Sequence, residues 1–151
     1  MTASVNPHTQ ALHRAGVSLW LDNITREMLD DGTLQKYIDR YAVTGLTSNP
    51  TIFDQAIGDA DFYDAAIREK VAKGLSGEAL FFELALEDLT RAADLFAPVF
   101  ERTNGLDGFV SLEVSPLLAY DADATLAAAK YFLRRRKVFF RDEVAAEEAS
   151  K

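Results

Sequence analysis

One stretch of this sequence, residues 43–53, constrains the fold more than any other; it reads V-T-G-L-T-S-N-P-T-I-F. An apolar start leads to the polar residues Thr47, Ser48 and Asn49, and a proline follows at once. Because the residue before a proline avoids the helical conformation, the polar tip has to end in extended backbone. The pattern predicts a strand over 43–48 that presents polar side chains at its carboxyl end, with a helix directly after it.

Two other segments repeat this design. Residues 17–21 are mostly apolar and end at Asp22, and residues 108–114 are mostly apolar and end at Ser115. Helical patterns, with apolar residues every three or four positions, lie at 25–31, 33–41, 62–73, 76–94 and 124–135. Strands that alternate with helices pair in parallel through right-handed crossovers, so the three polar tips are expected at one edge of a sheet. That edge is where α/β sheets and β/α barrels build their sites.

The size, charge and residue usage of the chain narrow its possible functions. At 151 residues it is about one domain, and a net charge of −8 argues against a nucleic-acid-binding surface. The chain has no cysteine, which excludes disulfides, thiol catalysis and thiolate metal sites. Its two histidines, His8 and His13, both lie in the first segment, so no metal site is expected.

The sequence gives no indication of a membrane segment or of a nucleotide cofactor. No run of about 18 apolar residues exists, and the first ten residues lack the basic and apolar order of a signal peptide. Neither G-x-G-x-x-G nor G-x-x-x-x-G-K-[S/T] follows any predicted strand. We therefore expect a cytoplasmic protein with no cofactor, no membrane contact and no nucleic-acid partner.

The residues at the three strand tips resemble those of transaldolases, most closely the bacterial form. The resemblance is carried by S-L-W-L-D at 18–22, T-G-L-T-S-N-P-T-I-F at 44–53 and V-S-L-E-V-S-P at 110–116, followed by Tyr120 and Asp121. It covers about residues 18–130, which correspond to the N-terminal portion of a family member. Residues 131–151 form a divergent tail.

The resemblance implies a fold and an activity. The family fold is a (β/α)8 TIM barrel, so the chain is expected to be α/β, a partial barrel of three to four β/α units with parallel strands, in a single domain over 1–151. Transaldolases transfer a dihydroxyacetone unit between sugar phosphates in the pentose phosphate pathway. They use a lysine Schiff base on the fourth strand, without a cofactor or a metal.

The resemblance also assigns roles to residues at the strand tips. Asp22 is implied as the catalytic acid/base at the end of the first strand, and Glu113 as the catalytic carboxylate that positions a proton-shuttling water. Asn49, together with Thr47 and Ser111, is implied to bind substrate hydroxyls. From the local pattern alone, Asp22 is equally well explained as a helix N-cap, and both interpretations stay open at this point.

The sequence departs from the family after Lys130. The nearest equivalent of the lysine strand is V-F-F-R-D at 138–142, in which Arg141 stands where lysine is required. Arginine is not available as a neutral amine, so we expect a chain truncated before the nucleophile and inactive alone. The basic cluster at 134–137 is interpreted as the charged end of a helix in preference to a phosphate site.

Three interpretations of the chain follow: a transaldolase-family enzyme, a non-catalytic remnant of one, and an interaction module. An open barrel leaves strand edges and an inner face uncovered, which favours a homo-oligomer or completion by another chain. A sugar phosphate substrate is the other expected partner, if the chain is active. Trp20 and Tyr120 are interpreted as core residues in preference to residues that border the site.

Overall fold

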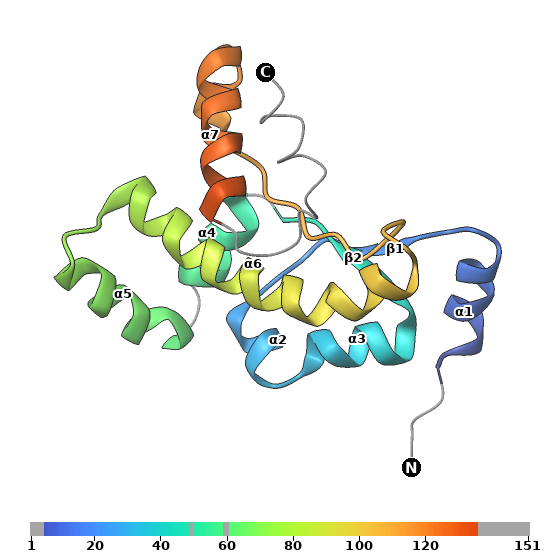
Figure 1. The fold of residues 1–151 in the computed structure, drawn as a ribbon. Helices are drawn as coiled ribbons and strands as arrows, with labels where there is room; N and C mark the ends of the chain where they lie inside the picture. The colour runs from blue at the N-terminus through green and yellow to red at the C-terminus, as the bar shows by residue number, and fades with distance from the viewer. Residues whose placement is uncertain (1–4, 49, 59–60, 136–151) are drawn as a thin grey trace.

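The computed structural model describes residues 5–48, 50–58 and 61–135 (Figure 1). The elements in chain order are α1 (Pro7–Arg14), β1 (Leu19–Leu21), α2 (Arg26–Asp30), α3 (Thr33–Tyr41), β2 (Val43–Leu46), α4 (Pro50–Gly58), the 3₁₀ turn η1 (Asp61–Tyr63), α5 (Asp64–Ala72), α6 (Gly77–Arg102), the 3₁₀ turn η2 (Pro116–Leu118) and α7 (Ala122–Arg135). The segment 138–142, which includes Arg141 and could be either a fourth strand or a continued helix from its sequence, lies outside the described residues.

The first two predicted strands form and pair in parallel. Trp20 of β1 lies opposite Gly45 of β2, and Leu21 lies opposite Leu46. A parallel bridge then joins Leu46 to Val110. The three neighbours therefore follow one another in sequence order, β1 then β2 then the Val110 segment, as the alternation of strands and helices predicted.

The third predicted strand, 108–114, is shorter than expected. It is reduced to the bridge at Val110, which is held by bonds from the Leu46 amide to the Phe109 carbonyl (3.0 Å) and from the Ser111 amide to the Leu46 carbonyl (2.9 Å). Beyond Ser111 the segment leads directly to η2, which begins at Pro116, and a proline cannot donate a ladder hydrogen bond.

Helix α6 provides the platform on which the sheet rests. It runs for 26 residues and packs against α2, α3, α5 and β2 (Figure 1). The sequence predicted a helix ending near 94, but α6 continues through Pro98 to Arg102. A proline removes one helical hydrogen bond, and burial of Phe96 and Val99 on either side of it offsets that cost.

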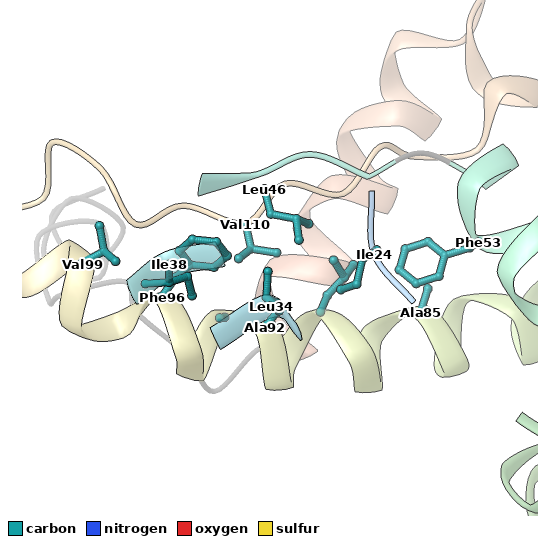
Figure 2. Close-up of a cluster of buried hydrophobic side chains, with 12 residues drawn as sticks. Ile24, Leu34, Ile38, Leu46, Phe53, Ala85, Ala92, Phe96, Val99 and Val110 are labelled. Atoms are coloured by element: carbon teal, nitrogen blue, oxygen red, sulfur yellow. The ribbon is translucent and has the colours of Figure 1, made fainter. Parts of the chain in front are cut away.

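The hydrophobic core lies between the sheet and the helices. Figure 2 shows Leu46 and Val110 pointing from the sheet toward α3 and α6. The core cluster consists of buried residues from the strands, α3, α4, α6 and the β1–α2 loop: Ile24, Leu34, Ile38, Leu46, Phe53, Ala85, Leu89, Ala92, Ala93, Phe96, Val99 and Val110. Because side chains alternate along a strand, the residues next to Leu46 and Val110 belong to the opposite face of the sheet.

The described residues also bear on membrane-spanning helices and on metal-binding groups. None of the helices there combines the length and the apolar character that crossing a bilayer requires. Across 5–48, 50–58 and 61–135, no three His, Cys, Asp or Glu side chains gather as a metal-binding group would.

Candidate active site

The carboxyl ends of β1 and β2 bring two of the predicted site residues into contact. The Thr47 hydroxyl donates a hydrogen bond of 2.8 Å to Asp22 Oδ1, across 25 positions of sequence. The Thr47 amide also donates to the Leu21 carbonyl at 2.8 Å, which extends the ladder to the strand tip. Asp22 is exposed and Thr47 is half-buried, so the pair is fixed in place and open to a ligand.

Asp22 is not the N-cap of the following helix. Helix α2 starts at Arg26, and Thr25 caps it by accepting a 3.2 Å bond from the Met28 amide. The local pattern alone could not reject a capping role for Asp22, because Asp is a favoured N-cap residue. The structure decides for Thr25, and the Asp22 carboxylate turns instead to the neighbouring strand.

Ser111 lies beside the tip of β2. The Ser48 hydroxyl donates a 2.7 Å bond to the Ser111 carbonyl, and the Ser111 amide donates to Leu46. Since Leu46 and Val110 both face the core, alternation assigns Ser111 to the same sheet face as Thr47. We call Asp22, Thr47 and Ser111 the strand-tip site.

The other two predicted site residues are Glu113 and Asn49. Glu113 is exposed, two positions beyond Ser111, in the extended segment that leads to η2. Asn49 lies outside the described residues. The roles implied for all five residues stay predictions, and the hydrogen bonds at the strand tips involve Asp22, Thr47 and Ser111.

Two aromatic residues do not occupy the core positions interpreted for them. Trp20 is 40% exposed, and its indole lies over Gly45 of the neighbouring strand. Tyr120 is fully exposed. Both core interpretations are therefore wrong, and Trp20 instead shares the sheet face of Asp22, which directly follows β1.

A second polar group, which we call the ion cluster, was not foreseen from the sequence. It consists of Arg26, Tyr63, Lys70, Glu87 and Asp88, contributed by α2, η1, α5 and α6. Arg26 Nε lies 2.8 Å from Asp88 Oδ1, and the Tyr63 hydroxyl donates a 2.7 Å bond to Asp88 Oδ2. The Asp88 side chain is fully buried.

The remaining contacts complete the ion cluster. Glu87 bridges Arg26 Nη2 (3.1 Å) and Lys70 Nζ (2.5 Å), and the Arg26 guanidinium lies 4.5 Å from the centre of the Tyr63 ring. Burial raises the pKa of the Asp88 carboxyl against the lowering effect of its partners. Burial also raises the pKa of the Tyr63 hydroxyl, and its hydrogen bond to Asp88 adds to that rise.

Comparison with known proteins gives a consistent match. A family model described as Transaldolase/Fructose-6-phosphate aldolase matches residues 19–144. A transaldolase of Arthrobacter sp. (strain FB24) is 47% identical over 127 residues, which cover 84% of this chain and 34% of the relative. The transaldolase of Kocuria rhizophila is 48% identical over 122 residues, covering 81% and 33%. The transaldolase of Mycobacterium tuberculosis is 42% identical over 129 residues, covering 85% and 34%. The chain thus spans about a third of the length of these relatives.

Proposed function

The chain belongs to the transaldolase/fructose-6-phosphate aldolase family, and from that premise we propose that its strand-tip site is part of a centre for transfer of a dihydroxyacetone unit between sugar phosphates. The observation that carries the proposal is the bond between Thr47 and Asp22 at the ends of adjacent parallel strands. The first part of the family barrel would be represented by the two parallel strands β1 and β2 and by the Val110 segment, which joins β2 through a parallel bridge.

We assign each of these residues a role in the aldol reaction. In aldol cleavage the bond between two carbinol carbons breaks, and a base has to accept the proton of the hydroxyl on the departing fragment. An exposed carboxylate held by a hydroxyl donor can do this, which is the role we propose for Asp22. Glu113 would position the water that shuttles protons to and from the carbinol oxygen, and Asn49, Thr47 and Ser111 would bind substrate hydroxyls.

The Schiff-base nucleophile is the part of the reaction for which the chain offers no clear group. In the family the lysine stands on the fourth strand, and the corresponding sequence here has Arg141. A permanently charged guanidinium cannot add to a carbonyl carbon. We therefore propose that residues 1–151 alone bind a sugar phosphate without forming the covalent adduct.

Borohydride trapping tests the missing nucleophile. The chain is incubated with fructose 6-phosphate, reduced, digested and analysed by mass spectrometry; the expected result is no lysine adduct. An adduct that requires both substrate and borohydride, mapped to Lys137 or another lysine, would overturn the proposal that the isolated chain is inactive.

A second candidate function is a self-associating or partner-completed module. Its support is the exposed Trp20 on the sheet face opposite the core. Size-exclusion chromatography with light scattering should then show a dimer or larger species. A monomer that persists at high protein concentration would exclude this candidate.

A further inference from the structure

The exposed indole of Trp20 rests directly on the backbone of the neighbouring strand. A Cβ atom added at Gly45 would lie 2.6 Å from Trp20 Cδ2 and 2.7 Å from Nε1, and closer still to Cε2. Such distances are far inside van der Waals contact, so no other residue fits at 45 while the indole keeps its place. Gly45 does not have a positive φ, so the contact with Trp20, and not the backbone conformation, requires the glycine.

The indole and the strand-tip site form two successive layers on one sheet face. Trp20 pairs with Gly45 in the first layer, and Asp22 bonds to Thr47 in the second. Residues two apart on a strand are separated by about 6.6 Å, which is within the reach of one small ligand. The indole packs against Gly45, and 40% of the Trp20 surface is exposed to solvent.

An open aromatic surface beside a fixed carboxylate and hydroxyl suits one chemical class of ligand. The carbon chain of a sugar carries C–H groups that pack against an aromatic ring and hydroxyls that need hydrogen-bond partners. Ligand sites generally combine apolar or aromatic walls with a few placed polar groups. Trp20 supplies the wall here, while Asp22 and Thr47 supply the polar groups.

We propose that Trp20 is a substrate-binding residue that packs against the C–H groups of an open-chain polyhydroxy ketone or aldehyde and thereby directs a hydroxyl to Asp22. This inference rests on the proposed function, because it assigns a further contact to the same site. Gly45 is the positioning residue of the arrangement, since it lets the indole lie flat on β2.

The chain contains its own reporter for this proposal, because Trp20 is its only tryptophan. Selective indole excitation during titration with fructose 6-phosphate should give a saturable change in emission, and acrylamide should quench the bound state less. Inorganic phosphate at the same concentrations is the control probe and should change neither quantity. Isothermal titration calorimetry measures the affinity independently of fluorescence.

Two variants test whether the aromatic ring of Trp20 contributes to binding independently of its contribution to folding. Trp20→Leu should weaken binding of fructose 6-phosphate by about fivefold to tenfold, the size expected for loss of one aromatic packing contact. Trp20→Phe keeps an aromatic ring and should retain most of the affinity. Circular dichroism of both variants checks that the fold is intact, and the quenching measurement on the unmodified chain stands if Trp20→Leu does not fold.

The outcomes distinguish this inference from the function on which it rests. If fructose 6-phosphate binds and Asp22→Asn weakens binding, but Trp20→Leu and the emission do not respond, the role of Trp20 is overturned and the proposed function stands. If calorimetry detects no binding to the unmodified chain, both proposals fail for residues 1–151. If the emission depends on protein concentration and not on the sugar phosphate, the indole is an association surface and the inference is wrong.

Discussion

The ion cluster and the strand-tip site use similar side chains for opposite purposes. In the ion cluster, Asp88 is fully buried and both of its oxygens are occupied, by Arg26 and by Tyr63. In the strand-tip site, Asp22 is exposed and bonded at one oxygen by Thr47. The difference shows how a carboxylate is recognised as structural or as available: a structural one is enclosed by partners from several helices, and an available one stands at a strand end.

The largest expected effect comes from breaking the ion cluster. Asp88→Ala should lower the free energy of unfolding by about 3–5 kcal/mol, because it leaves the half-buried Arg26 charge and the Tyr63 hydroxyl without their acceptor. Urea denaturation measures this. Asp94→Ala, at an exposed position of the same helix, is the matched control and should change stability by less than about 0.5 kcal/mol. Equal effects at the two positions would contradict the structural role of the cluster.

Alkaline pH probes the same cluster through Tyr63. Because its pKa is raised in the folded protein, the unfolded chain loses that proton first as the pH rises above about 10. The stabilisation is complete below that pH and is lost above it, by up to about 1.4 kcal/mol per pH unit. Tyr63→Phe should remove this part of the pH dependence, and Tyr120→Phe, at an exposed position, should leave it unchanged. Identical alkaline slopes for the unmodified chain and Tyr63→Phe would refute the prediction.

On the strand face a packing change should have an intermediate effect. Gly45→Ala places a methyl group against the Trp20 indole and should cost about 1 kcal/mol, the lower end for overpacking because the half-exposed ring can move. Combining it with Trp20→Ala should remove the clash, so the two changes should be non-additive in urea denaturation. Simple additivity would show that the glycine is needed for another reason.

The smallest stability effect is expected at the strand-tip site itself. In Asp22→Asn the side-chain oxygen can still accept the Thr47 hydrogen bond, so the free energy of unfolding should change by less than about 0.5 kcal/mol. Binding of fructose 6-phosphate should nevertheless fall, because a substrate hydroxyl loses its charged hydrogen-bond acceptor. Calorimetry and urea denaturation of one protein preparation give both numbers. A large loss of stability would show that Asp22, like Asp88, has a structural role.

The sequence predicted the strand-tip site better than the rest of the molecule. A local pattern, an apolar run that ends in polar residues before a proline, was enough to place Thr47 at the end of β2, and the same pattern placed Asp22 at the end of β1. Parallel pairing then followed from the alternation of strands and helices. The contact between Asp22 and Thr47 needed only those two local inferences.

The ion cluster could not be predicted in the same way. Arg26 and Asp88 are 62 positions apart, and Tyr63 is 25 positions from Asp88. Each is an ordinary polar residue on an amphipathic helix or turn, and only the packing of α2 and α5 on α6 makes them partners. The length of the third strand was over-predicted for a related reason: the pattern at 108–114 shows that the residues suit a strand, whereas the pairing that completes a strand depends on tertiary packing.

The parallel register of β1 on β2 decides which side chains meet at the strand tips. Trp20 lies opposite Gly45 and Leu21 opposite Leu46, so the next pair along the two segments is Asp22 and Thr47. Because side chains alternate between the two faces, a slip of one residue would turn Asp22 or Thr47 toward the core. The pairing of the backbones therefore sets the position of the carboxylate, and a change in the core that alters this pairing would act on the site without touching it.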